Sequence, residues 1–330
     1  MRIEASAPGK FVLSGEYAVL DGAPAICVAV DRRAVVTIEP HDGDRHLVRA
    51  PGFTAETGRF TADSGQLTWL DNGRDFGLFE TVWNVSRPAS ADSALTISLD
   101  TGVFRDPDSG RKIGLGSSAA LAVALATALN SLGGGSAADA AHAAHRLFQG
   151  GSGSGVDIAC SMAGGIIEYR MAGQQSRQAK WPDGLLFSVL WSGVAAETRD
   201  RVARFGDLAD SPSRNELSEA SVLVAALFES GDTPAVVAAL GEYVQALFRF
   251  DAAHELGIFD AGHRALAEQA AGAGVVYKPC GAGGGDIGVA LATSRASLAS
   301  FETIAARSGF SRIALSIDRS GAMLHDKDET

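Results

Sequence analysis

The apolar positions divide the chain into a strand-rich first third and a more helical remainder. Short apolar runs separated by glycine, aspartate and proline turns predict strands in the first hundred residues. Between Phe76 and Trp83 the apolar residues instead recur at helical spacing, which predicts a helix over 76–85. The predicted strands lie at 11–13, 25–30, 34–39 and 94–99.

The middle of the chain has helical periodicity. An alanine-rich run predicts a helix from Ser117 through residue 132. After a GGGS turn, a second predicted helix begins at Ser136 and ends near residue 148. A glycine-rich segment precedes the first helix and another follows the second, and both become important below.

Beyond residue 180 the predicted order is strand, helices, strand, strand, helix and strand. This is the split βαβ arrangement of ferredoxin-like domains, with extra helix in the first crossover. We therefore expect an α+β protein with an N-terminal domain over 1–180 and a C-terminal domain over 181–330. The expected C-terminal elements lie at 186–191, 212–230, 233–271, 274–278, 288–292, 294–307 and 311–316.

The composition indicates a soluble globular protein and disfavours several classes of partner. The 330 residues, 46% of them hydrophobic, are enough for a substantial core. A net charge of -11 disfavours nucleic acid, although a small anionic ligand responds to local amides and cations instead. No run has the pattern of a membrane span or a secretory signal, so we expect no membrane partner.

The three cysteines predict reduced thiols. Cys27, Cys160 and Cys280 are odd in number, far apart and without CxxC or Cys/His spacing, which disfavours a disulfide framework and a zinc site. Buried, reduced thiols are typical of a cytoplasmic enzyme, which is the location we expect.

The stretch RKIGLGSSAA, residues 111–120, places two glycines and two serines directly before a strong helix. Gly114 and Gly116 let the backbone approach a ligand, and the N–H groups of the first helical turn have no partner inside the helix. Such a helix start favours phosphate, and a serine there could ligate the Mg2+ of a nucleotide. Alternatively, Ser117 or Ser118 is only the N-cap of the helix.

Two named phosphate motifs fit this stretch poorly. The P-loop pattern G-x-x-x-x-G-K-[ST] is absent, since Gly9 and Lys10 are followed by Phe11. The dinucleotide fingerprint matches the spacing of Gly114, Gly116 and Ala119, but a polar loop separates these residues from the preceding strand. Neither fold is therefore expected.

Three further stretches have two interpretations each. In APGKFVLSGEYAVLDG, residues 7–22, Lys10 could point into a site or be solvated, and Glu16 and Tyr17 share this ambiguity. In QGGSGSGVDIACS, Asp157 could cap a helix or lie near a phosphate acceptor. In CGAGGGDIGVAL, residues 280–291, there are more glycines than a turn requires, which suits close backbone approach to a ligand.

In this order, the four stretches resemble the three signature motifs of the GHMP small-molecule kinases, with the aspartate segment between the second and third. The resemblance covers residues 7–292. It is strongest to the phosphomevalonate kinases, because GEYAV has their tyrosine and Lys112 matches one of their basic residues. Mevalonate kinases usually carry a Mg2+-binding glutamate on the helix before the aspartate loop. Here Asp139 is the only acid between Ala119 and Val156.

The resemblance implies a ribosomal-S5-like N-terminal domain and a ferredoxin-like C-terminal domain, with ATP and the acceptor in the cleft between them. It implies ATP-dependent phosphorylation of 5-phosphomevalonate to 5-diphosphomevalonate, a step of the mevalonate pathway to isoprenoid precursors. The implied cofactors are ATP and Mg2+. The implied partners are these small molecules, for a monomer or a homodimer.

The resemblance also implies roles for individual residues. Lys10 would bridge the γ-phosphate and the acceptor, Lys112 would neutralise a phosphate, and Asp157 would orient the reacting groups. Ser117 or Ser118 would ligate Mg2+. The implied ATP-binding residues are Gly114, Leu115, Gly116, Ser117, Ser118 and Ala119. The implied acceptor-binding residues are Glu16, Tyr17, Ser152, Ser154, Gly281, Ala282, Gly283 and Gly284.

Three alternatives remain open at this point. A GHMP kinase for another acceptor, such as mevalonate or a sugar, would share every glycine motif. Mevalonate diphosphate decarboxylases share the fold but lack the lysine of the first motif, which is present here as Lys10. A catalytically silent sensor of nucleotide and metabolite would keep the fold without turnover.

Overall fold

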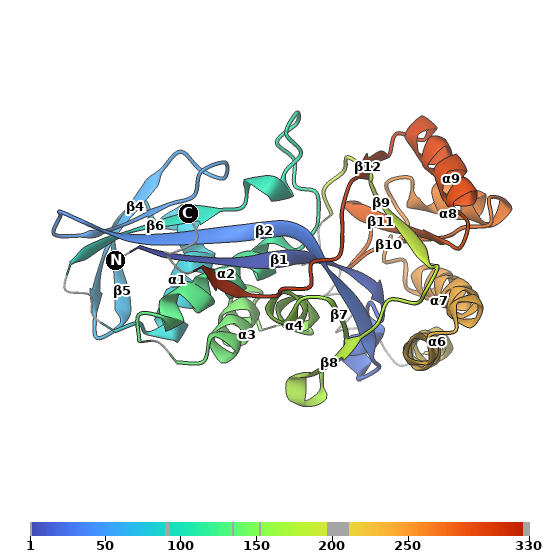
Figure 1. Ribbon diagram of the computed structural model, residues 1–330, viewed down its shortest axis with the longest axis horizontal. Coiled ribbons are helices and arrows are strands. Elements are labelled where there is room, and N and C mark those ends of the chain that lie inside the picture. Colours follow the sequence, from blue (N-terminus) through green and yellow to red (C-terminus); the bar gives the residue numbers. More distant parts are fainter. Residues whose placement is uncertain (1, 90–92, 134, 152, 197–210, 326–330) are drawn as a thin grey trace.

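Two β-sheets, each covered by helices, form the protein, and the long strands of the first extend toward the second (Figure 1). The computed structural model describes residues 2–89, 93–133, 135–151, 153–196 and 211–325. Helices and antiparallel strands segregate as expected for an α+β protein, and this fold class is confirmed.

The first sheet is built on two long antiparallel strands, β1 (Ile3–Ser14) and β2 (Ala25–His41). The strands expected at 25–30 and 34–39 are both parts of β2, because the polar residues at 31–33 continue in extended conformation. The hydrogen-bonded order is β13-β1-β2-β6-β3-β4-β5, with β7 paired to β2 and to β8. The remaining strands are β3 (His46–Arg49), β4 (Thr57–Asp63), β5 (Gln66–Asp71), β6 (Ala94–Asp100), β7 (Ile166–Arg170), β8 (Gln175–Ala179) and β13 (Met323–His325).

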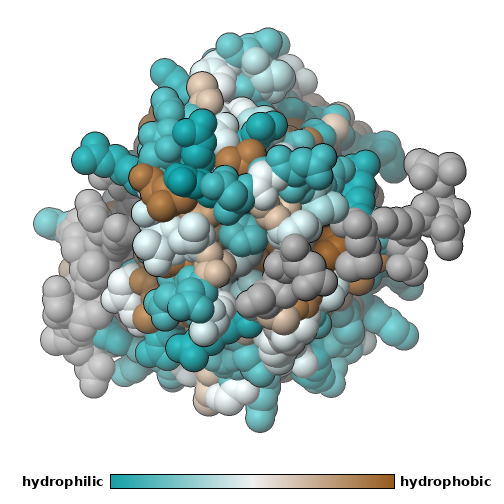
Figure 2. All heavy atoms as spheres, turned by 90° about the vertical axis from the view of Figure 1, so that its left-hand side faces the viewer, coloured by the Kyte–Doolittle hydropathy of each residue, from teal (hydrophilic) through white to brown (hydrophobic). Residues whose placement is uncertain are grey.

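Strands β3, β4, β5, β7, β8 and β13 were not predicted. Most of these short runs are mixed with exposed polar residues, whereas β7 is a short buried strand with Glu168 in its middle. An aromatic cluster anchors the distal strands to α1 (Gly77–Ser86). In this cluster the ring centroid of Phe60 on β4 lies 5.4 Å from that of Phe79 and 5.0 Å from that of Trp83. The outer surface of this end is mainly hydrophilic, with scattered apolar residues (Figure 2).

Four α-helices pack in the first half of the molecule, and α2 (Ser117–Asn130) lies against β1 and β2. Most of its alanines are buried, because small side chains allow the helix to pack closely on all sides. The expected helices at 76–85, 117–132 and 136–148 are confirmed within two residues. The others are α3 (Ala137–Phe148) and α4 (Val156–Ala163), with short 3-10 helices η1 (Ala18–Asp21), η2 (Gly73–Phe76), η3 (Gly102–Phe104) and η4 (Ala172–Gln174).

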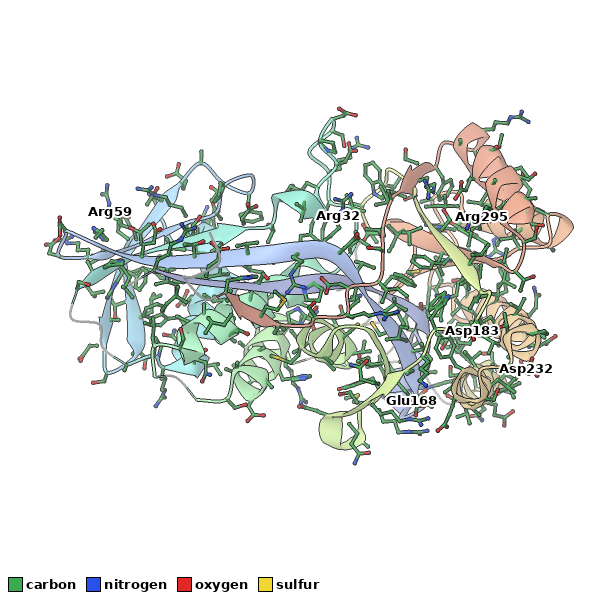
Figure 3. The ribbon with its side chains drawn as sticks, viewed as in Figure 1. Arg32, Arg59, Glu168, Asp183, Asp232 and Arg295 are labelled. Carbon is green, nitrogen blue, oxygen red and sulfur yellow. The ribbon has the colours of Figure 1, made fainter. Side chains whose placement is uncertain are left out.

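The second sheet has the strand order β10-β11-β9-β12, and all of its pairs are antiparallel. This is the ferredoxin-like arrangement that the predicted element order required. Helix α7 begins after Asp232, whose side chain accepts a hydrogen bond from the Ala235 N–H at 3.2 Å (Figure 3). The elements are β9 (Leu186–Trp191), α6 (Pro212–Ser230), α7 (Thr233–His254), α8 (His263–Gly272), β10 (Val276–Pro279), β11 (Ile287–Ala292), α9 (Arg295–Arg307) and β12 (Ser311–Ile313).

The single helix predicted over 233–271 is wrong, because the chain breaks between α7 and α8. Glu255 ends α7 with a left-handed backbone conformation, φ 50°. The buried carboxylate of Asp251 then accepts a hydrogen bond from the Ile258 N–H at 2.9 Å, which satisfies backbone that has left the helix. The apolar spacing alone did not reveal this turn.

The last described residues return to the first sheet. Strand β13 pairs antiparallel with β1, and Ile317 forms a bridge with Val30. Arg33 holds this segment, donating hydrogen bonds to Asp318 and to the Gly321 carbonyl at 2.5 and 2.6 Å. Of the helices in the described ranges, none is long and apolar enough to cross a membrane.

Candidate active site

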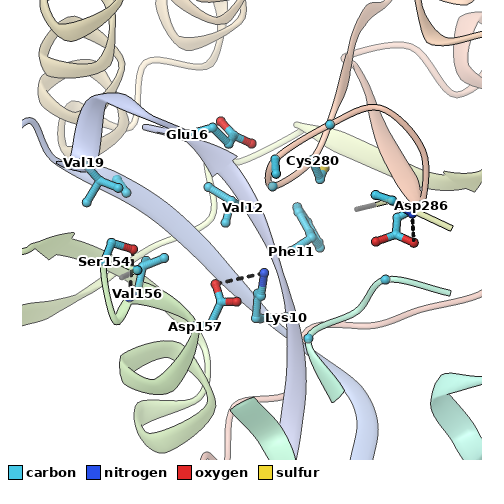
Figure 4. Close-up of a pocket in the computed structure, with 18 of the residues that line it drawn as sticks. Lys10, Phe11, Val12, Glu16, Val19, Ser154, Val156, Asp157, Cys280 and Asp286 are labelled. Carbon is cyan, nitrogen blue, oxygen red and sulfur yellow. Dashed lines mark hydrogen bonds and ion pairs between the residues drawn. The ribbon is translucent and has the colours of Figure 1, made fainter. Parts of the chain in front are cut away.

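A cleft of about 220 Å³ opens where the two sheets meet (Figure 4). Its walls come from β1 and η1, the start of α2, the loop before α4, and the loop between β10 and β11. All four motifs of the sequence analysis therefore meet in one place. The residues from those motifs that line it are Lys10, Glu16, Tyr17, Lys112, Gly114, Gly116, Ser118, Ser154, Asp157, Gly281, Ala282 and Gly283.

Lys10 and Asp157 face each other across the cleft between β1 and α4 (Figure 4). The Lys10 Nζ lies 2.9 Å from the Asp157 Oδ1, and the Lys10 side chain is only 8% exposed. Burial by itself lowers the pKa of Lys10, but the charge and hydrogen bond of the adjacent Asp157, together with the nearby Cys27 and Cys160, outweigh it and hold that pKa above its usual value. The ammonium is therefore charged at neutral pH.

The loop before α2 packs directly on Lys10. The Lys10 N–H donates a hydrogen bond to the Leu115 carbonyl at 2.9 Å. Gly116 has φ +76°, and a Cβ at this position would lie 2.8 Å from the Lys10 Cε. Gly114 has φ +98°, and a Cβ there would lie 2.3 Å from the Asp286 Cβ. Glycine is thus required for conformation and for close packing.

The interpretation of Ser117 or Ser118 as an N-cap is wrong. Gly116 is the N-cap of α2, and no side chain caps this end of the helix. The amides of the first turn therefore lack the usual side-chain acceptor at a helix start that borders the cleft. This arrangement suits an anionic ligand.

Asp157 is likewise not an N-cap. Helix α4 begins after Gly155, which makes Asp157 the second helical residue, directed toward Lys10. The preceding loop is held by Ser154, whose Oγ accepts a hydrogen bond from the Val156 N–H and whose carbonyl accepts one from the Tyr169 hydroxyl. The carboxylate is thereby placed at the cleft rather than used to terminate a helix.

Glu16 is tied into a buried network between the two sheets. Lys278, on β10, is completely buried and forms an ion pair with Glu16 Oε1. The Tyr243 hydroxyl, from α7, donates a hydrogen bond to Glu16 Oε2 at 2.6 Å and accepts one from the Gly15 N–H. The Lys278 Nζ also donates to the Val12 carbonyl at 3.3 Å.

Tyr17 connects the first motif to the glycine-rich loop of the second sheet. Its backbone has φ +63°, and its hydroxyl donates a hydrogen bond to the Ala282 carbonyl at 2.6 Å. Gly283 packs against Ile258, where a Cβ would lie 2.4 Å from the carbonyl oxygen. Gly284 donates its N–H to that carbonyl, so this loop is held from both sides.

Two cleft residues, His145 and Asp286, were missed by the sequence analysis. The His145 Nε2 lies 3.2 Å from the Ser118 Oγ, and burial lowers the pKa of this histidine. Asp286 has φ +52°, and its Oδ1 accepts a hydrogen bond from the Ala196 N–H at 3.2 Å. His145 follows a helical pattern of alanines, and Asp286 follows five residues of glycine and alanine, so neither stood out as a candidate.

The remaining expected residues lie outside the cleft wall. Leu115 and Ala119 are fully buried in the core, Ser117 is half-buried beside it, and Gly284 is engaged with Ile258. Ser152 lies outside the described residues.

Comparisons with known proteins identify the family. Residues 79–165 match the family model for the GHMP kinases N terminal domain. A phosphomevalonate kinase from Streptomyces sp. (strain CL190) is 32% identical over 88% of this chain and 90% of that protein. The chain belongs to the GHMP kinase family. A mevalonate kinase from Thermococcus sibiricus is 30% identical to this GHMP kinase, and the match covers 62% of this chain and 61% of the mevalonate kinase.

The fold is shared with solved GHMP kinases. A structure of Streptococcus pneumoniae phosphomevalonate kinase, in complex with phosphomevalonate and AMPPNP, superposes with a TM-score of 0.76. It covers 95% of this chain and 99% of its own at 19% sequence identity. The expected GHMP kinase fold is therefore confirmed. Because its relatives in sequence are kinases of the mevalonate pathway, the protein is a phosphotransferase of this group.

Proposed function

We propose that this GHMP kinase transfers the γ-phosphoryl group of ATP to 5-phosphomevalonate, giving ADP and 5-diphosphomevalonate. The observation that carries the proposal is the Lys10–Asp157 pair, which lies beside the uncapped start of α2 in one cleft. The Streptomyces phosphomevalonate kinase matches 88% of the chain, whereas the Thermococcus mevalonate kinase matches 62% of it.

In this proposal the loop before α2 holds the phosphates of ATP. Gly114, Gly116 and Ser118, which line the cleft, supply backbone amides, and Leu115, Ser117 and Ala119 hold the loop and the first helical turn in place behind them. Lys112, exposed at the rim, neutralises a phosphate. Helix-start amides are fixed donors, so they need no reorganisation as charge shifts from one phosphate to another.

The residues of the cleft fit a Mg2+ ion that is bound mainly through the nucleotide. Magnesium prefers oxygen ligands and commonly takes only one or two from the protein, with phosphates and water supplying the rest. Ser118 Oγ lines the cleft and can serve, with Ser117 as the alternative. The described residues contain no cluster of three or more acidic, histidine or cysteine side chains that could form a protein cage. When bound, Mg2+ would neutralise phosphate charge.

Lys10 is the proposed bridge between the γ-phosphate and the acceptor. Two phosphates must approach each other in this reaction, and a buried ammonium offsets their repulsion. Asp157 would orient Lys10 and the acceptor. A phosphate monoester has a second pKa near 6, so at neutral pH its oxygen is already nucleophilic and needs little help from a base.

The acceptor would occupy the side of the cleft between Asp157 and the glycine-rich loop. We assign this side to Ser154, Gly281, Ala282 and Gly283, together with Tyr17 and Glu16. Gly284 would hold the loop from behind through Ile258, and the role expected for Ser152 concerns a residue outside the described ranges. Both Glu16 oxygens already have partners, so Glu16 would shape this wall through Lys278 and Tyr243. We further propose a cytoplasmic monomer or homodimer, with no nucleic acid or membrane partner.

An acceptor panel tests the proposal. Purified protein is incubated with Mg2+-ATP and each of 5-phosphomevalonate, mevalonate, galactose or mevalonate 5-diphosphate, and ADP release, CO2 release and product mass are measured. We expect turnover with 5-phosphomevalonate alone. Efficient phosphorylation of mevalonate would show that mevalonate, not 5-phosphomevalonate, is the acceptor. Release of CO2 would indicate a decarboxylase. Absence of turnover with every acceptor would indicate a sensor.

A further inference from the structure

Three helices bring their ends together at Ser118. Ser118 is the second residue of α2, His145 lies in the last turn of α3, and Asp157 is the second residue of α4. Ser118, His145 and Asp157 all line the cleft. His145 is only 4% exposed, which is unusual for a histidine near a helix end, and this burial is not explained by the roles assigned so far.

The contact of His145 is specific. Its Nε2 lies 3.2 Å from the Ser118 Oγ, within hydrogen-bonding distance. Helix α3 carries one acid, Asp139, but that residue is exposed in its first turn, about 9 Å along the axis from His145. His145 thus provides a polar contact from α3 to the start of α2.

A serine near a helix start can turn its hydroxyl away from solvent or ligand. Inside a helix, serine and threonine hydroxyls often donate to a backbone carbonyl of the preceding turn, as Thr127 does to the Val123 carbonyl. Ser118 is the second residue of α2 and has no such turn before it, so its hydroxyl is free to rotate. An acceptor on the opposite side prevents this rotation. This acceptor receives a hydrogen bond from the hydroxyl, so the lone pairs of the serine oxygen point away from it.

We propose that His145 is a positioning residue, whose Nε2 accepts a hydrogen bond from the Ser118 hydroxyl and keeps the Ser118 oxygen facing the cleft for the cation or phosphates of bound nucleotide. This inference rests on the proposed ATP site. His145 itself need not touch the nucleotide. Residues that orient a ligating side chain in this way commonly change ligand affinity by about 10- to 100-fold when removed.

The neighbouring His142 provides a matched control. It lies one turn earlier on α3, is half-buried, and borders a small side pocket rather than the main cleft. Its substitution perturbs the same helix without removing the contact to Ser118. Comparison of the two positions therefore separates loss of the hydrogen bond from general disturbance of α3.

The test is a double-mutant cycle read by equilibrium binding. Affinity for AMPPNP, with and without Mg2+, is measured by calorimetry for wild type, H145M, H145Q, S118A, S118A/H145M and H142M. We expect H145M to weaken Mg2+-AMPPNP binding about tenfold. We expect H145Q, whose amide oxygen can accept the same bond, to recover most of this loss, and H142M to bind as wild type.

The decisive arm is the double variant. If His145 acts through Ser118, H145M causes no further loss of affinity once Ser118 is alanine. Equal losses in both backgrounds would overturn the proposal and make His145 a direct ligand contact or a structural residue. Failure of H145Q to recover affinity, while its thermal unfolding remains that of wild type, would also overturn it. The cycle needs no acceptor, so it stands apart from the acceptor panel.

Discussion

The ammonium of Lys278 and the carboxylate of Glu16 form an ion pair in which the two side chains are 0% and 3% exposed. The pair joins the second sheet to the end of β1, and Tyr243 completes it from α7. A buried pair is only weak evidence for net stability, but removal of one partner leaves a charge without compensation.

We therefore expect Lys278→Met to lower the free energy of unfolding by about 3–5 kcal/mol. The double variant Lys278→Met with Glu16→Gln should recover part of this loss, because no charge is then left unpaired. Urea unfolding at pH 7 measures both. The matched control is the exposed pair of Arg249 and Glu216, where Arg249→Met should cost less than about 1 kcal/mol. Similar losses at the two sites would contradict this role of burial.

Lys10 and Asp157 should contribute unequally to turnover. Lys10→Met removes the charge that separates two phosphates, and we expect kcat to fall by at least about 10²-fold while the fold stays intact. Asp157→Asn keeps the shape and some hydrogen bonding, so its loss should be smaller. Steady-state kinetics with 5-phosphomevalonate, together with circular dichroism, decide this. A more severe defect in Asp157→Asn would establish that carboxylate as an obligatory base.

Gly116 should be intolerant of even a methyl group. In Gly116→Ala the new Cβ meets the Lys10 side chain, and a left-handed φ is imposed on alanine, so we expect a large fall in kcat. Gly241, inside α7, has no atom within 4 Å of an added Cβ. Gly241→Ala should therefore leave kcat unchanged and raise stability by up to about 1 kcal/mol. Wild-type turnover in Gly116→Ala would show that Lys10 does not depend on this contact.

Because of His263, the free energy of unfolding should depend on pH. Burial lowers its pKa from 6.5 to about 4, and its ring nitrogens contact the Tyr277 hydroxyl and the Gly285 carbonyl. The unfolded chain thus binds a proton at a higher pH than the folded protein does. Stability is therefore lost as pH falls from about 6.5 to 4, by up to about 3 kcal/mol.

Chemical unfolding at several pH values tests this dependence. The slope between pH 6.5 and 4 should be smaller in His263→Gln, whose amide has no proton to bind in this range. An unchanged slope in that variant would assign the pH dependence to other groups. Half-buried His41 is a suitable control position, because its Nε2 contacts the Arg45 carbonyl of a nearby turn rather than the core.

The sequence revealed the regular parts of the fold and the glycine motifs. Long periodic segments such as α2 and α9 were predicted closely, because burial of one helix in a core requires a repeated pattern. The polar strands β4 and β5, at the far end of the first sheet, lacked such a pattern, and Glu255 broke a helix through backbone conformation. These features depend on tertiary contacts.

The residues of the candidate site also divide into those that the sequence indicated and those that only the structure revealed. Lys10 and Asp157 stood out because their neighbours are glycines, although only the structure gives the 2.9 Å contact between them. Lys278, Tyr243 and His145 lie within ordinary strand or helix patterns, so no local signal set them apart. Their importance comes from partners distant in sequence, such as Glu16 and Ser118.

The pairing of β13 with β1 affects how the protein can be synthesised. The edge of β1 remains open until residues 323–325 have left the ribosome, so β1 is completed by a strand that follows every other described element of the fold. A nascent chain that already holds every glycine motif still presents an unpaired strand edge, which is a template for association with other chains. Premature termination before residue 323 would therefore favour aggregation over a slightly shortened enzyme.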